Sequence, residues 1–192
     1  MIRALGKYPL TFLGIALSLL GLLVVASGSL ELVYLFSLQE ISGSEYWRLV
    51  TPAFLHFDLI HLGGNMAFFW FLGSQVERQD GKLLFLLNFL VLAVAANVAQ
   101  LLVVPEHLFG GMSGVNFGLL SYCMLSNRIS PRPVFLFPPG LFWFSVVMLL
   151  VGFSGIFSLF GYDIANWAHL GGFLSGFLTA IVIRPLTRFY RG

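Results

Sequence analysis

The sequence predicts an all-α, polytopic membrane protein with six transmembrane helices, and three observations lead to that prediction. The 192 residues are 58% hydrophobic and only 9% charged, whereas a soluble domain carries about 25% charged residues. The apolar residues fall into six long runs, and charged residues separate these runs. Lipid must therefore surround most of the chain, and helices satisfy their own backbone hydrogen bonds in lipid.

The six runs predict helices over about residues 9–29, 59–76, 83–104, 113–127, 141–160 and 164–184 of a single domain, 1–192. The first run resembles a secretory signal, because Arg3 and Lys7 precede it and small residues follow it. It is longer than a usual signal core of about 7–15 residues, and more apolar runs follow, so a retained first span is favoured. Four prolines before the fifth run hold the preceding loop out of helix.

The stretch from Glu31 to Asp58 separates the first two predicted helices. It is too polar to span a membrane and too aromatic to be a free linker. Tyr46 and Trp47 are amphipathic aromatic residues of the kind that anchor segments at the membrane–water interface. We therefore expect this first loop to lie at the interface, with Trp47 and Arg48 mainly anchoring it.

The positive charges predict the orientation of the chain, because Lys and Arg concentrate on the cytoplasmic side of membrane proteins. If the N-terminus is cytoplasmic, only Arg48 of the ten Lys and Arg residues falls outside. Both termini are then expected to be cytoplasmic. The cations on that side are Arg3, Lys7, Arg78, Lys82, Arg128, Arg132, Arg184, Arg188 and Arg191.

Strongly polar residues gather at one level of the predicted bundle. In this orientation the second, fourth and sixth helices all begin at the outer side. Their outer ends carry His61 and Asn65, then Ser113, then His169. Polar and ionisable residues inside spans are costly, and they are hypotheses for a functional site by default.

The depth of Ser113 follows from the length of its helix. Gly110 and Gly111 should interrupt a helix, so the fourth helix is predicted to begin near Ser113. The segment from Ser113 to Asn127 rises roughly 22 Å, and the hydrocarbon core is about 30 Å thick. Ser113 then lies on the order of 10 Å below the outer surface, at a depth similar to that of His169. The two side chains can therefore meet within the membrane.

A serine beside a histidine suits nucleophilic catalysis. A neutral imidazole at hydrogen-bond distance takes the proton of the hydroxyl, which predicts Ser113 and His169 as catalytic residues. The oxyanion that follows needs hydrogen-bond donors. The backbone N–H of Ser113, at a helix N-terminus, is one. His61 and Asn65, four residues apart on one helix face, are predicted to supply the others.

Small residues recur every four positions on the fourth and sixth predicted helices. Such faces let two membrane helices approach closely. We therefore expect these two helices to pack through them and to bring Ser113 towards His169. The two sets are Gly110, Gly114 and Gly118, and Ala168, Gly172 and Gly176.

Three other residue types have simple interpretations. Asp163 is expected to cap the sixth helix or to lie in the preceding loop rather than to complete a triad. Cys123 is the single cysteine and is expected to be a packing residue. His56, Asp58 and His61 lack the His-Glu-x-x-His pattern of a metal site, so neither a metal nor another cofactor is expected.

The ordered combination of these motifs resembles the rhomboid family of intramembrane serine proteases, in its six-helix bacterial form. The resemblance covers about residues 47–176 and is carried by three helices, which makes it specific. The matching motifs are Trp47-Arg48, His56, His61-xxx-Asn65, Glu77-Arg78, Gly111-Met112-Ser113-Gly114 and Ala168-His169-xx-Gly172-xxx-Gly176.

The resemblance implies a bundle of rhomboid type in a bacterial inner membrane, with the active site open to the outer side. It implies a Ser113–His169 dyad without an acidic third member. It also implies an oxyanion site of the Ser113 amide, His61 and Asn65. Residues expected to support this site through packing are Gly111, Gly114, Phe117, Gly118, Ala168, Gly172 and Gly176.

Two positions depart from the pattern of the family. A tyrosine usually follows the serine by four residues, but Phe117 stands there and cannot hydrogen-bond through a hydroxyl. The residue two before the histidine is often small, and here it is Trp167. Neither change removes a catalytic group, although both alter the expected shape of the pocket.

In the family, the substrate is a single-span membrane protein that is thought to enter between the second and fifth helices. Phe153, Phe157 and Phe160 are candidates to line that entrance, but a lipid-facing aromatic belt is the simpler interpretation. The expected partners are thus a transmembrane protein substrate and membrane lipid. A nucleic acid is not expected, because no basic run is present. The oligomeric state stays open.

The predicted function is therefore that of an intramembrane serine protease. The alternative is a catalytically inactive rhomboid-like protein that binds transmembrane segments without cutting them. The presence of both Ser113 and His169 argues against this alternative. A channel or transporter would need charged residues along a continuous path, whereas the polar groups here stop at one level.

Overall fold

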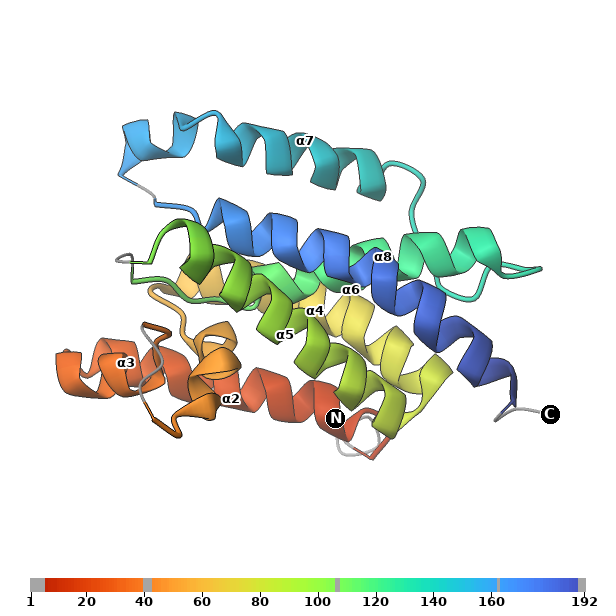
Figure 1. Ribbon diagram of the computed structural model, residues 1–192, viewed down its shortest axis with the longest axis horizontal. Coiled ribbons are helices and arrows are strands. Elements are labelled where there is room, and N and C mark those ends of the chain that lie inside the picture. The colour runs from red at the N-terminus through yellow and green to blue at the C-terminus, as the bar shows by residue number, and fades with distance from the viewer. Residues whose placement is uncertain (1–5, 40–42, 106–107, 162, 190–192) are drawn as a thin grey trace.

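The computed structural model describes residues 6–39, 43–105, 108–161 and 163–189, and it is helical throughout that part of the chain, without strands (Figure 1). It therefore confirms the predicted helical membrane bundle. The long helices are α2 (Pro9–Ala26), α4 (Leu59–Asp80), α5 (Lys82–Val103), α6 (Ser113–Ile129), α7 (Leu141–Phe153) and α8 (Asn166–Phe189). The first loop contains α3 (Leu30–Phe36) and the 3₁₀ turns η1 (Tyr46–Leu49) and η2 (Thr51–Phe54), and η3 (Ile156–Phe160) follows α7.

The helices differ in how clearly they are membrane spans. In the described residues, α2, α5 and the Asn166–Thr187 part of α8 are long and apolar enough to cross a membrane by length and composition alone. The other three predicted spans fall short, because α4 is more polar, α6 has 17 residues and α7 has 13. The polar side chains Asn65 of α4 and Asn116 of α6 are buried, so protein rather than lipid surrounds them.

Several helix ends differ from those predicted. Helix α2 ends at Ala26, because Gly28 adopts a left-handed turn with φ of 71° before α3 begins. Helix α4 continues to Asp80, beyond the predicted end at residue 76. Helix α7 ends at Phe153, and Gly155, with φ of 76°, separates it from η3.

The sixth predicted helix also has different bounds. Helix α8 begins at Asn166 and continues past Pro185 to Phe189. Asp163 lies in the loop ahead of it and is exposed. Of the two places predicted for Asp163, a cap of this helix or the preceding loop, the structure shows the loop.

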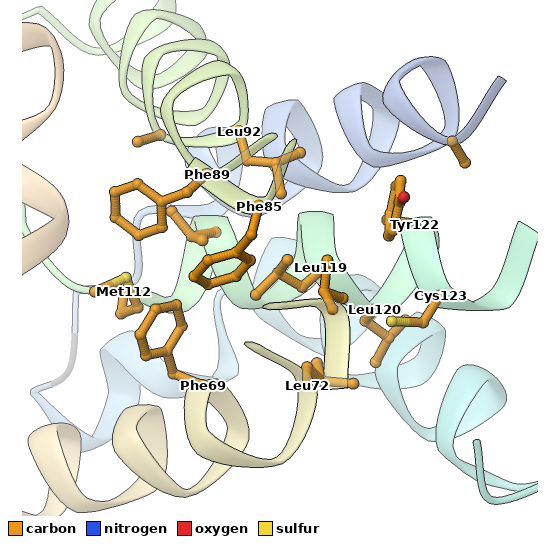
Figure 2. Packing of buried hydrophobic residues seen from close by; sticks show 14 of the residues in the cluster. Phe69, Leu72, Phe85, Phe89, Leu92, Met112, Leu119, Leu120, Tyr122 and Cys123 are labelled. Atoms are coloured by element: carbon orange, nitrogen blue, oxygen red, sulfur yellow. The ribbon is translucent and has the colours of Figure 1, made fainter. Parts of the chain in front are cut away.

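Helix α6 occupies the centre of the bundle. Helices α4, α5 and α8 surround it, while α7 lies along one edge beside α8 and α2 along the opposite edge (Figure 1). Side chains from α4, α5 and α6 interdigitate in the core, which Figure 2 shows. Because lipid is as apolar as leucine, close van der Waals packing rather than escape from water stabilises this core. Its largest fully buried members include Phe69, Leu72, Phe85, Leu92, Met112, Leu119 and Tyr122.

Helices α6 and α8 touch backbone to backbone. A Cβ atom placed on Gly172 would lie 1.9 Å from the carbonyl oxygen of Gly114, and one on Gly176 would lie 2.0 Å from that of Gly118. In the other direction, a Cβ on Gly114 would lie 3.1 Å from the oxygen of Ala168. No side chain fits at the first two positions, so glycine at residues 172 and 176 sets the distance between the helices.

At the opposite end of the bundle from Ser113, two buried carboxylates hold helices together. Glu77 accepts hydrogen bonds from the backbone N–H groups of Leu10 and Thr11, at 3.0 and 2.8 Å, and from the Thr11 hydroxyl at 2.7 Å. Asp80 forms an ion pair with Arg184 of α8. The sequence assigned Arg184 to the cations of the cytoplasmic side. In the structure its side chain is buried in the interior and does not face an aqueous surface.

The first loop is fixed by hydrogen bonds to backbone carbonyls. Arg48 donates to the oxygens of Tyr34 and Ser37, and Trp47 Nε1 donates to Leu35 at 3.2 Å. These bonds fit the anchoring role expected for Trp47 and Arg48. From α5, Asn97 Nδ2 donates to the oxygen of Leu49 at 2.9 Å, which ties the loop to the bundle.

The contact between α6 and α8 predicts that Gly172→Ala destabilises the protein. The new methyl group would overlap the Gly114 carbonyl and force the helices apart, at a cost of about 1–3 kcal/mol. Thermal unfolding in detergent measures this. Gly63→Ala is the matched control, since a Cβ on this α4 glycine meets nothing within 4 Å. It should be neutral or stabilising, and an equal loss in both variants would contradict the close-contact explanation.

Candidate active site

Ser113 and His169 lie within hydrogen-bond distance at one end of the bundle. Ser113 is the first residue of α6, and His169 lies in the first turn of α8. The Ser113 Oγ is 2.8 Å from the His169 Nε2. Both residues are half-buried. A serine hydroxyl in this position can give its proton to the imidazole.

Neighbouring residues fix the histidine ring and the start of its helix. The Phe117 ring stacks on the His169 ring, with centroids 4.8 Å apart and planes inclined by 29°. Gln100 Oε1 of α5 accepts a hydrogen bond from the Ala168 N–H at 3.2 Å. Asn166 Nδ2 donates to the oxygen of Gly152 in α7 at 2.8 Å. Stacking therefore holds the imidazole, and α5 and α7 hold the start of its helix.

His61 and Asn65 lie beside the loop that leads into Ser113. A Cβ placed on Gly111 would lie 2.7 Å from the His61 Nε2 and 3.7 Å from the Asn65 Nδ2, so both side chains face this glycine. Asn65 Nδ2 donates to the oxygen of His61 at 3.0 Å. Asn116 of α6 donates to the Oδ1 of Asn65 at 3.1 Å, which fixes the orientation of that amide.

The loop before Ser113 rests on η2. Gly111 adopts φ of 125°, a conformation that side chains disfavour, and its N–H donates to the oxygen of Pro52 at 2.9 Å. A Cβ on Gly110 would lie 2.7 Å from the Leu55 Cβ. The two glycines thus allow the chain to turn tightly against the first loop before α6 begins.

His56 also supports this loop and is fully buried. Its Nδ1 lies 3.0 Å from the oxygen of Phe54, which can only accept, so this nitrogen carries the proton. The other nitrogen, Nε2, then accepts from the Met112 N–H at 3.5 Å. Burial is the main cause that lowers the pKa of His56 from 6.5 to about 4. His56 is therefore neutral at neutral pH.

The structure brings together most of the residues predicted for the site. Ser113, His169, His61, Asn65 and Phe117 belong to one cluster at the same end of three helices, α4, α6 and α8. The packing residues Gly114, Gly118, Ala168, Gly172 and Gly176 lie on the facing sides of α6 and α8.

Two residues of this cluster were not predicted. Asn116 holds Asn65, and Gln100 holds the α8 terminus. Asn116 follows Ser113 by three residues on the same helix, so the rule that singled out polar residues within spans would have found it. The same rule would have found Gln100, which lies within the predicted span 83–104, but it gives no signal of its partner, a backbone N–H of a distant helix.

Trp167 lies outside the immediate contact of Ser113 and His169. Its ring meets the Phe153 ring of α7 edge to face, with centroids 5.1 Å apart. It lines a cavity of about 220 Å³ between α5, α8 and the end of α7, together with Gln100, Asp163 and Asn166. Within the described residues, no group of three or more His, Cys, Asp or Glu residues is arranged to hold a metal ion.

The neutral state of His56 predicts a pH-dependent stability. Because folding lowers the pKa of His56 from 6.5 to about 4, the unfolded chain takes up a proton at this residue as the pH falls below 6.5, while the folded protein does not. The free energy of unfolding therefore decreases as the pH falls from 6.5 towards about 4. Over this range, the wild type should lose about 1 kcal/mol or more relative to His56→Gln. Melting temperatures of both proteins across the pH range measure the difference. Parallel curves for the two proteins would contradict a buried, neutral His56.

Comparison with known proteins agrees with this architecture. A sequence model described as the Rhomboid domain matches residues 43–186. The Rhomboid protease GlpG of Serratia proteamaculans is 39% identical over 136 residues, which are 71% of this chain and 48% of that protein. The GlpG proteins of Yersinia pestis and Yersinia pseudotuberculosis are 38% identical over the same shares. This chain spans about half the length of these curated relatives, and it belongs to the rhomboid family.

Proposed function

We propose that this protein is an intramembrane serine protease that hydrolyses peptide bonds in or near transmembrane segments of membrane proteins. The observation that carries the proposal is the 2.8 Å contact between Ser113 Oγ and His169 Nε2. Relatives that are 38–39% identical and named rhomboid proteases support it.

The reaction follows from the geometry of the dyad. The Ser113 oxygen attacks the carbonyl carbon of the scissile bond, while His169 Nε2 accepts the hydroxyl proton. The imidazolium then returns this proton to the leaving amine, and Ser113 keeps the acyl group. Water, deprotonated by the same imidazole, attacks the ester and releases the second product.

The oxyanion site lies where η2, α4 and α6 meet. As the first residue of α6, Ser113 has a backbone N–H without a helical acceptor. The side chains of His61 and Asn65 face the adjacent Gly111 and supply further donors. Asn116 Nδ2 donates a hydrogen bond to Asn65 Oδ1 and so holds the Asn65 amide in one orientation. The Asn65 donor is therefore oriented before the substrate arrives. Such preorganised donors lower the barrier for a developing oxyanion.

We propose a location in a bacterial inner membrane, with both termini cytoplasmic and the site open to the outer side. The described cations Lys7, Arg78, Lys82, Arg128 and Arg132 support this, since they belong to the ends of helices opposite the dyad. Arg48 lies in the first loop, at the end of the bundle that contains the dyad. Arg3, Arg191 and the side chain of Arg188, which were assigned to the same side, lie outside the described residues.

The proposed substrate is a transmembrane protein that reaches the dyad from the lipid. Helix α7 is the edge element beside this route, packed against α6 and α8 (Figure 1). Phe153 at the end of α7 and Phe160 in η3 are exposed, as expected of residues that contact lipid or a passing helix. Displacement of α7 would admit a substrate without disturbing the contact between α6 and α8.

Labelling with a fluorophosphonate probe tests the nucleophile. We expect purified wild-type protein to form an adduct on Ser113 and to cleave a transmembrane substrate in proteoliposomes. Ser113→Ala and His169→Ala should each lower cleavage by at least about 10³-fold and abolish labelling, with unchanged melting temperatures. Wild-type protein that is folded, binds transmembrane segments and neither labels nor cleaves would favour an inactive binding protein.

Asn65→Ala tests the oxyanion site. Removal of a donor that acts in the transition state should lower kcat by about 10²–10³-fold and leave KM nearly unchanged. Asn88→Ala is the matched control, since Asn88 is also a buried asparagine but lies on α5. A rise in KM alone, or an equal loss of kcat in both variants, would contradict the proposed role of Asn65.

A further inference from the structure

A second cavity lies at the end of the bundle opposite the dyad. It has a volume of about 430 Å³ and opens between the start of α2 and the turn that joins α4 to α5. Gly81 forms this turn with φ of 85° and connects two helices that both project charges towards the cavity. The residues that line it are Lys7, Tyr8, Glu77, Arg78, Gly81 and Lys82.

The charge of this cavity is positive. Three cations line it, whereas Glu77 is the only carboxylate among the lining residues. Glu77 is 3% exposed, and its two oxygens are directed at Leu10 and Thr11 of α2. It thereby occupies the first N–H groups of that helix. In the part of the chain that the structure describes, no carboxylate forms a salt bridge with Lys7 or Lys82. The cavity is therefore suited to an anion held by side chains.

The surroundings of the cavity favour a lipid as the source of the anion. Lys7 and Lys82 are exposed, and Tyr8, which meets the Trp70 ring edge to face at 5.7 Å, is an aromatic residue typical of the interface. Beyond Lys82, the α5 residues Leu83 and Leu87 are 67% and 48% exposed, four positions apart on one face. Acyl chains can lie along this face while a headgroup enters the cavity.

We propose that this cavity binds the phosphate group of an anionic phospholipid, with Lys7 and Lys82 as its cationic ligands. Basic pockets between membrane helices on the cytoplasmic side suit such headgroups. The bound lipid would join α2 to the turn between α4 and α5. This role is separate from the dyad, because the cavity and Ser113 lie at opposite ends of α4 and its neighbours.

Lipid binding to purified Ser113→Ala protein tests the proposal, because this background excludes any effect of proteolysis. Native mass spectrometry would count phosphatidylglycerol bound from mixtures with phosphatidylcholine. Each cation near a membrane surface contributes roughly a fivefold change in affinity. Lys7→Gln with Lys82→Gln should therefore weaken phosphatidylglycerol binding about 25-fold and leave phosphatidylcholine binding unchanged. The melting temperature without lipid checks that the variant is folded.

A matched control separates a site from general surface charge. Arg128→Gln with Arg132→Gln removes the same charge from exposed residues outside the cavity. This control should bind phosphatidylglycerol like the parent protein. An equal loss in both double variants would overturn the proposal, as would equal binding of the two lipids by the parent protein.

A third arm distinguishes a lipid from a free anion. Phosphatidylglycerol in mixed micelles should raise the melting temperature of the parent protein, and the Lys7→Gln, Lys82→Gln variant should lose most of this rise. Inorganic phosphate at the same concentration should have little effect, because it lacks the acyl chains. Stabilisation by inorganic phosphate as large as that by the lipid would show a phosphate site and overturn the lipid assignment.

Discussion

The backbone contact between α6 and α8 is the constraint on which the rest of the structure depends. Ser113 and His169 are 56 positions apart in the chain and have short side chains, so they meet only if their helices touch. Gly172 and Gly176 remove the atoms that would keep the helices apart. Since association in lipid gains little from the hydrophobic effect, this close packing supplies the attraction as well as the geometry.

Irregular backbone near the site is stabilised by protein groups instead of water. The oxygen of Pro52 accepts a hydrogen bond from the Gly111 N–H, and His56 Nε2 accepts one from the Met112 N–H. Arg48 and Asn97 satisfy carbonyls of the first loop. Unsatisfied backbone groups are costly at membrane depth. The first loop is therefore part of the support of Ser113, although it contributes no residue to the contact between Ser113 and His169.

The sequence predicts the parts of this arrangement that depend on local pattern. Helix rise and the break at Gly110 and Gly111 place Ser113 and His169 at one depth, and the spacing of small residues identifies the facing sides of two helices. The end of α7 and the burial of Arg184 escaped prediction. The first depends on the left-handed Gly155, and the second on Asp80, a partner 104 positions away that no local pattern connects to it.

The pairing of Asp80 with Arg184 has a consequence for biogenesis. During synthesis, the carboxylate of α4 enters the membrane region long before α8 emerges from the ribosome. Until then it has no Arg184 to neutralise it, and the glycine face of α6 has no helix to contact. Arrival of α8 therefore supplies the counter-charge for Asp80, the surface that the α6 glycines contact and the imidazole that lies beside Ser113. The serine of α6 is therefore made well before the histidine of α8, and the two side chains meet only after α8 has joined the bundle.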